Sequence, residues 1–203
     1  ADSVEWPGGL LVLSRDEPTD VVVLNRLPEA TAVHWHGVEL ESYWDGVAGW
    51  SGAAGTLAPV IAPGDSFIAR LTLPRAGTFM YHTHLNDNLQ LSSGLYGPII
   101  VLEPGARFDP GHDLVYVAGW NGPSGRHLLV NGDSVAPALR LRQGEAHRLR
   151  FVSIGIANRP LFTLTRDSLP VRWRPLAKDG QDLPAARSVP GPARVMSVFI
   201  CLG

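Results

Sequence analysis

Short apolar runs, broken by glycine and proline, recur along the whole chain. None of them keeps the repeat of a long amphipathic helix, whereas their lengths and their content of Val, Ile, Phe and Tyr are typical of strands. The 22 glycines and 17 prolines separate the runs. Predicted strands cover residues 10–13, 20–25, 31–36, 66–73, 78–84, 98–102, 113–118, 128–131, 139–142, 147–152, 161–165, 171–174 and 195–200. Short strands at this spacing predict an all-β fold built of sandwiches.

A stretch rich in proline and glycine, residues 103–111, interrupts the series of strands. We expect a domain boundary there, with a first sandwich over residues 1–104 and a second over residues 105–203. Two sandwiches of about a hundred residues each fit ordinary domain sizes.

Composition narrows the possible partners. Hydrophobic residues make up 45% of the chain and charged residues 18%, and the formal net charge is −2. Without a basic block we expect no nucleic-acid partner, and the apolar runs are too short to span a bilayer.

The single cysteine, Cys201, excludes an intrachain disulfide and fits a small apolar strand residue. Residues 1–3 carry no basic segment followed by an apolar core, so we expect a signal peptide to be absent or already removed.

Four of the seven histidines form two His-x-His pairs, His34-Trp35-His36 and His82-Thr83-His84. Each pair lies in a predicted strand, where alternate side chains share a face. Both imidazoles of a pair therefore point the same way. If the two strands lie side by side, the four rings converge.

Neutral imidazole is a good ligand for transition metals, and neither pair contains a carboxylate or a thiol. An all-nitrogen set argues against calcium or magnesium and favours copper or zinc, without separating the two. The simpler alternative is a chance pair on the surface. His112, His127 and His147 stand alone in the sequence, and for them we expect solvated or hydrogen-bonded roles.

The sequence around the histidine pairs resembles the first domain of multicopper oxidases. The matching segments, in the same order and at similar spacing, are residues 31–37, 43–47, 62–66, 77–84 and 94–101. Three further segments resemble that family's middle domain, namely residues 129–132, 148–151 and 173–180. The resemblance implies two cupredoxin-like Greek-key sandwiches, of which the second is incomplete and has no copper ligands.

The resemblance also implies a role for each matching residue. His34 resembles a ligand of the type 2 copper, and His36, His82 and His84 resemble ligands of the type 3 pair. Asp45 resembles the acid beside the cluster that helps to deliver protons to bound oxygen. Its simpler alternative is a turn residue, because Asp-Gly is a common turn pair.

Trp35 and Tyr81 lie between or beside the candidate ligands. They fit residues that pack against the ligands and orient them. Ordinary burial in a core explains them equally well.

Two features of the family are absent from these 203 residues. These are the sequence motifs His-Pro-x-x-His-x-His and His-Cys-His, which in the family complete the trinuclear cluster and hold the type 1 copper. Neither motif occurs here, and Cys201 has no histidine beside it. We therefore expect a truncated member that carries half of the type 2/type 3 site and no type 1 site. Members of the family oxidise phenol-like donors and reduce dioxygen to water, and we expect little or no such activity from this chain alone.

A half-site and a missing domain lead us to expect a homo-oligomer. The family resemblance favours a periplasmic or secreted location, although the compartment is otherwise open. Two other functions compete with the laccase-like one. The first is a non-catalytic copper-binding or partner-assembly module. The second is a cupin-type metal enzyme, in which Glu39 follows the first histidine pair but Pro74, Gly77 and His82 are wrongly spaced.

Overall fold

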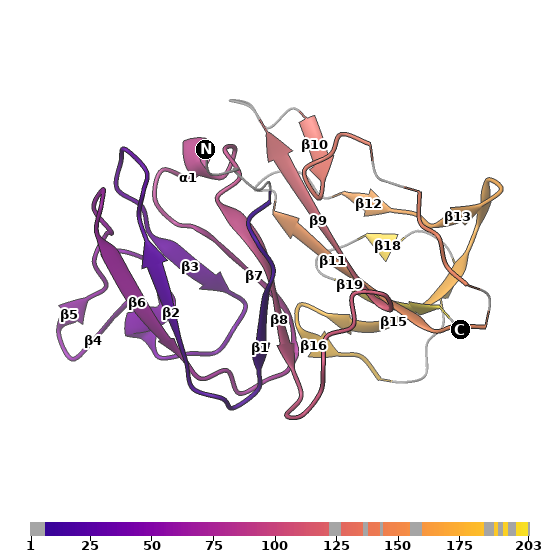
Figure 1. Cartoon of the computed structure of the whole chain (residues 1–203), viewed down its shortest axis with the longest axis horizontal. Coiled ribbons are helices and arrows are strands. Elements are labelled where there is room, and N and C mark those ends of the chain that lie inside the picture. Colours follow the sequence, from indigo (N-terminus) through magenta and orange to yellow (C-terminus); the bar gives the residue numbers. More distant parts are fainter. Residues whose placement is uncertain are drawn as a thin grey trace.

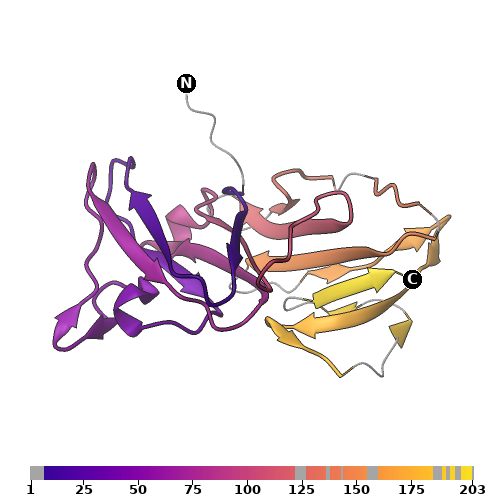
Figure 2. The same cartoon turned by 60° about the horizontal axis from the view of Figure 1, so that its bottom comes forward.

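The computed structural model describes residues 7–121, 127–135, 138–142, 144–154, 160–184, 189–190, 193–194 and 198–202 of the chain. Figures 1 and 2 show two groups of strands side by side, one from the first half of the sequence and one from the second. The elements of the described residues are strands apart from two short helical turns, in agreement with the predicted all-β class. No described helix has the length and apolar character needed to cross a membrane.

The first half contains eight strands and both helical turns. They are β1 (Leu11–Ser14), β2 (Thr19–Leu24), β3 (Val33–His36), η1 (Ser42–Asp45), β4 (Gly52–Ala53), β5 (Thr56–Leu57), β6 (Ser66–Leu71), β7 (Gly77–Thr83), α1 (Asp87–Gln90) and β8 (Tyr96–Leu102). The main sheet has the strand order β1-β8-β7-β3, in which β1 and β8 are parallel and the other pairs antiparallel. A second sheet pairs β2 with β6.

A core lies between these two sheets. Its buried members are Trp35, Ala69, Leu71, Leu73, Phe79, Ile99 and Val101. The alternation along β2 explains the arrangement, because Val21 and Val23 pack against this core while Val22 and Leu24 face outward. Burial of one face of each sheet fixes the registers of the strands.

The second half consists of eleven described strands. They are β9 (Asp113–Asn121), β10 (His127–Val130), β11 (His147–Ile154), β12 (Leu161–Phe162), β13 (Thr165–Arg166), β14 (Leu169–Pro170), β15 (Arg172–Lys178), β16 (Gln181–Asp182), β17 (Val189–Pro190), β18 (Ala193–Arg194) and β19 (Val198–Leu202). The large sheet has the order β10-β9-β11-β19-β15-β16, with β17 also paired to β15. A separate core of Leu149, Phe151 and Trp173 packs against it. The domain boundary between residues 104 and 105 stays a prediction, which this separation of cores supports.

Some predicted strands differ from the observed ones. Residues 139–142 are neither strand nor helix, so the strand predicted there is wrong. The run 161–165 is divided between β12 and β13, which pair with different partners. Of the strand predicted over residues 195–200, positions 195–197 lie outside the described residues.

A third core joins the two halves. It consists of Tyr96 from β8 and Val117 and Val152 from β9 and β11, all nearly inaccessible to solvent. Gly119 of β9 makes this contact possible, because a Cβ atom at that position would lie 1.7 Å from the Tyr96 hydroxyl oxygen. The close approach therefore requires a residue without a side chain.

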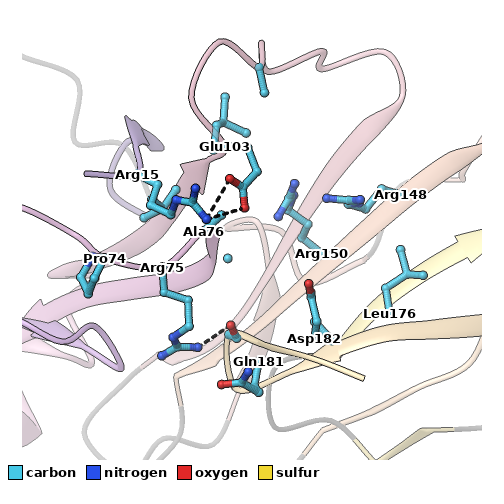
Figure 3. A pocket seen from close by; sticks show the side chains of 16 residues that line it. Arg15, Pro74, Arg75, Ala76, Glu103, Arg148, Arg150, Leu176, Gln181 and Asp182 are labelled. Carbon is cyan, nitrogen blue, oxygen red and sulfur yellow. Dashed lines mark hydrogen bonds and ion pairs between the residues drawn. The ribbon is translucent and has the colours of Figure 1, made fainter. Parts of the chain in front are cut away.

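Polar contacts also cross the junction between the halves. Arg150 of β11 donates to both carboxylate oxygens of Asp113 at 2.5 Å and to the Thr78 hydroxyl of β7 at 2.7 Å. Beside it lies a cavity of about 510 Å³ (Figure 3). Arg75 bonds the Gly180 carbonyl across this cavity, and Arg15 pairs with Glu103 at its rim.

We expect Arg150→Met to lower the free energy of unfolding by about 3–5 kcal/mol, because it leaves the Asp113 carboxylate without its buried partner. The matched control is Arg148→Met on the same strand, where the side chain is exposed and the change should stay within about 0.5 kcal/mol. Urea unfolding of the two variants checks this. Equal losses would contradict a structural role for the Arg150–Asp113 pair.

Candidate metal centre

The antiparallel pairing of β3 and β7 sets the direction of the histidine side chains. His34 lies directly opposite His82, and Trp35 lies opposite Tyr81. Trp35 and Thr83, the middle residues of the two pairs, are buried on the core side. Strand alternation therefore places the histidines of both pairs on the other face of the sheet.

The four imidazole rings lie together on this face. The ring centroid of His34 is 5.4 Å from that of His36, 5.3 Å from that of His82 and 5.5 Å from that of His84. Within the described part of the chain, only His34, His36 and His82 bring three ligand atoms within 4.8 Å of one another. His84 completes the group at its edge, with its ring 6.0 Å from that of His82.

Hydrogen bonds leave ring nitrogens facing one another. The Nδ1 of His82 lies 2.6 Å from the Thr83 carbonyl oxygen, which can only accept, so this nitrogen carries the proton and Nε2 has a lone pair. That Nε2 lies 3.3 Å from Nδ1 of His36. Two nitrogens bound about 2.0 Å from one tetrahedral metal ion are separated by about 3.3 Å. These two nitrogens are therefore correctly spaced to bind one metal ion. Without a metal ion, a proton on His36 Nδ1 forms a hydrogen bond to His82 Nε2.

His34 is oriented by the segment that follows β3. Its Nδ1 donates to the Asp45 carbonyl oxygen at 2.9 Å, with an oxygen of the Asp45 carboxylate 3.2 Å away. Ser51 donates to the other carboxylate oxygen at 3.2 Å. Gly46 has φ +77°, and a Cβ atom there would lie 1.7 Å from the Val33 carbonyl oxygen. Only glycine therefore lets Asp45 approach β3 so closely, and Nε2 of His34 is left free to bind a metal.

Gln90 of α1 holds the ends of the two histidine strands together. Its side-chain oxygen accepts from the hydroxyl groups of Thr31 at 2.8 Å and Thr83 at 2.6 Å, and its amide donates to the Ala30 carbonyl. Thr31, Thr83 and Gln90 are all buried. Neither Gln90 nor Ser51 was predicted from the sequence, since no local pattern marks a lone polar residue in a loop or a short helical turn.

Removal from water and crowding of the rings favour their neutral forms. Burial lowers the pKa of His82 from 6.5 to about 4. Partial removal from water, with the neighbouring His34 ring, also lowers the pKa of His36. Metal ions bind neutral imidazole, so these shifts favour binding at neutral pH.

Of the remaining histidines, two agree with the expectation made from the sequence and one does not. His112 donates to Asp109 at 2.8 Å, as expected for a hydrogen-bonded role, and His127 is exposed. The expectation that His147 is solvated or hydrogen-bonded is wrong for the described part of the chain, where this residue is 4% exposed and neither ring nitrogen has a hydrogen-bond partner. Cys201 lies in β19, and its side chain lies outside the described residues.

Comparison with known proteins identifies the family. Residues 4–106 match the family described as multicopper oxidase. The chain is 37% identical over 111 residues to an L-ascorbate oxidase of Cucumis sativus, covering 53% of this chain and 18% of that protein. It is 34% identical over 127 residues to copper resistance protein A of Escherichia coli, covering 61% and 19% respectively. The chain belongs to the multicopper oxidase family, whose members bind copper.

The fold agrees with this assignment. A blue copper oxidase from Nitrosomonas europaea superposes with a TM-score of 0.77 at 20% identity, over 97% of this chain and 66% of that chain. The cupredoxin-like sandwich fold predicted from the resemblance is thereby confirmed. The chain spans less than a fifth of the length of the two curated relatives described above.

The pKa of His82 predicts how stability depends on pH in the metal-free chain. Between pH 6.5 and about 4 the unfolded chain binds a proton at this residue and the folded chain does not. Acidification through this window therefore favours unfolding, by at most about 1.4 kcal/mol per pH unit. Urea unfolding in EDTA at pH 7, 5.5 and 4 measures the loss, which should be smaller in His82→Asn and unchanged in the exposed control His127→Asn. A His82→Asn variant as acid-sensitive as the parent would contradict it.

Proposed function

We propose that this chain contributes the amino-terminal half of a trinuclear copper site in a laccase-like multicopper oxidase. The observation that carries the proposal is the convergence of four imidazoles on one face of β3 and β7. The ligand types alone do not separate copper from zinc, and membership of the multicopper oxidase family favours copper.

The four histidines divide into two ligand roles by their positions in the family motif. His34, whose Nδ1 is held by Asp45, would bind the type 2 copper through Nε2. His36 and His82 present two nitrogens 3.3 Å apart and would bind a type 3 copper together, with His84 serving the other ion of that pair. When bound, copper supplies one-electron redox chemistry with dioxygen as the acceptor. The protein's contribution is to fix the tautomers and directions of the rings before the metal arrives.

Asp45 would act through its carboxylate in two ways. It accepts from Ser51 and lies 3.2 Å from His34 Nδ1, so it holds that ring in one orientation. Its side chain is 29% exposed and can therefore exchange protons with water. We propose that it delivers protons towards the copper face, as the corresponding acid does in the family.

The site is open on its outer side. His36 and His84 are exposed, and the described residues supply four imidazoles to a cluster that in the family takes ligands from two domains. The remaining ligands must come from elsewhere, either from another polypeptide segment or from a second copy. These 203 residues contain no His-Cys-His motif. They therefore provide no type 1 copper site at which electrons from a phenol-like donor could enter. This observation supports the second candidate function, a copper-binding or partner-assembly module without turnover.

Copper binding tests the proposal directly. We expect the parent chain to bind copper, and His36→Ala or His82→Ala to weaken the binding by more than the roughly 10- to 100-fold that loss of a ligand's hydrogen-bond partner produces. His127→Ala, which changes an exposed histidine of β10, is the matched control. Competition titration with a copper chelator gives the affinities, and an oxygen electrode with a phenolic donor should record little uptake by the copper-loaded chain.

The two measurements test the copper face and the half-site in turn. Equal affinities for the parent and both site variants would refute a copper role for this face. Rapid donor-dependent oxygen uptake would show that these residues are catalytically sufficient and would refute the half-site. Tight copper binding without uptake agrees with the half-site and with the module.

We also propose that the chain associates with a second copy of itself. The outer face of the β2/β6 sheet exposes Val22, Leu24 and Ile68, at 62%, 51% and 44%, and Val22 pairs directly with Ile68. Exposed apolar clusters of this kind are typical of interfaces. We expect an oligomer at micromolar concentration that Val22→Asp shifts towards the monomer, whereas Asp20→Asn on the same face does not. Analytical ultracentrifugation measures the mass, and a monomeric parent chain would contradict the proposal.

A further inference from the structure

The two-residue turn between β15 and β16 contacts the first half of the chain. Lys178 pairs with Gln181, and the intervening Asp179 and Gly180 have φ values of +50° and +69°. Positive φ at both positions is typical of tight hairpin turns, for which Asp-Gly is a favoured sequence. The Gly180 carbonyl oxygen accepts a hydrogen bond from Nη1 of Arg75, which lies just before β7 (Figure 3).

The guanidinium group of Arg75 binds both halves at once. Besides its bond to Gly180, it donates through Nη2 to the Gly37 carbonyl oxygen at 3.2 Å. Nη2 also lies 2.9 Å from Oε1 of Glu39, to which Nε donates at 3.1 Å. Cζ of Arg75 lies over the Phe79 ring, 5.1 Å from its centroid. These contacts use the planar, rigid arrangement of donors that distinguishes arginine from lysine.

The turn approaches Arg75 so closely that it requires glycine. A Cβ atom at Gly180 would lie 2.9 Å from Cζ of Phe79 and 3.0 Å from Nη1 of Arg75. A Cβ atom at Gly77, the first residue of β7, would lie 3.0 Å from the Gly180 carbonyl oxygen. We call the contact of Arg75 with Gly37, Glu39 and Gly180 the Arg75 bridge.

The Arg75 bridge ends beside a candidate copper ligand. Gly37 comes directly after His36, the last residue of β3, and turns the chain with φ +83°. Strand β3 stands at the end of the order β1-β8-β7-β3, so within this sheet it pairs with β7 alone. The hydrogen bond from Arg75 to Gly37 therefore holds the end of an edge strand, and with it the backbone of His36.

We propose that Arg75 is a positioning residue for His36, and that docking of the β15–β16 turn on Arg75 raises the copper affinity of the β3/β7 face. The inference rests on the proposed function, since it concerns the same face. The ligand group His34, His36 and His82 comes entirely from the first half. The second half would thus contribute to copper binding by fixing a ligand in place before the metal arrives, which lowers the cost of ordering it.

Loss of the Arg75 side chain changes charge and position in opposite directions. Removal of its positive charge leaves the Glu39 carboxylate without its partner, which by itself favours binding of a cation nearby. Release of Gly37 lowers the affinity, because His36 must then be ordered when the metal binds. A fall in copper affinity therefore reports the position of His36 and not the change in charge.

Copper affinity tests the positioning role. Cu²⁺ alone is titrated into the 203-residue chain against a chelator, without denaturant, and circular dichroism checks that each variant is folded. We expect Arg75→Met and Gly180→Ala each to weaken binding by about 10-fold, the lower end of the effect of losing an outer contact of a ligand. Arg75→Lys keeps the charge and part of the donor set, so its loss should be smaller.

Two matched controls lie outside the Arg75 bridge. Arg15 lines the same cavity but pairs with Glu103, so Arg15→Met should keep the parent affinity. Gly144 lies in the second half at φ +86°, with open space around its Cβ position. Gly144→Ala therefore introduces similar backbone strain without disturbing Arg75, and it should also keep the parent affinity.

Urea unfolding in EDTA tests the Arg75 bridge independently of copper. Arg75→Met and Gly180→Ala remove the same hydrogen bond, so their losses of stability should not add in the double variant. Additive losses would overturn the bridge. Non-additive losses with the parent's copper affinity in both single variants would overturn the positioning role. A parent chain that binds no copper would refute the proposed function, and the positioning role with it, while the unfolding measurements would still report the bridge.

Discussion

The register between β3 and β7 determines which way the histidines face. With His34 opposite His82, the two His-x-His pairs share a surface, and their intervening residues Trp35 and Thr83 share the core. A slip of one residue would exchange the two sets and bury the imidazoles. Burial of Trp35 and Thr83 therefore stabilises the register that places the metal-binding rings on the outer face of the sheet.

Residues around β3 and β7 further restrict the orientation of the histidine rings. Gln90 ties Thr31 and Thr83 together at one end of the strands, and Asp45 holds His34 from the side. Gly46 brings the Asp45 segment against β3 at a distance no other residue permits. Each contact reduces the rearrangement that metal binding needs, and such preorganisation raises affinity.

Much of the first half was predictable because its signals are local. Alternation identifies β2, β6 and β7, and the spacing within each His-x-His pair places two rings on one face. Residues 139–142 look equally strand-like but have no partner strand in the described structure. Apolar runs indicate what a segment can form, whereas pairing depends on neighbours distant in the sequence.

The same limit explains the contacts that the sequence did not reveal. His112 and His147 meet only because β9 and β11 run parallel, and Gly119 is needed only because Tyr96 packs against it. Each of these two contacts joins segments that are more than twenty residues apart in the sequence. No short motif encodes either of them, so only the three-dimensional structure brings them into view.

The coordination of copper on the β3/β7 face tests the central claim most directly. X-ray absorption spectroscopy of the copper-loaded chain measures this coordination. The structure predicts nitrogen scatterers at about 2.0 Å, typical of imidazole, with the outer-shell pattern of several rings that weakens when His82 is replaced by alanine. A spectrum of oxygen scatterers alone, or one indifferent to the loss of His82, would contradict it.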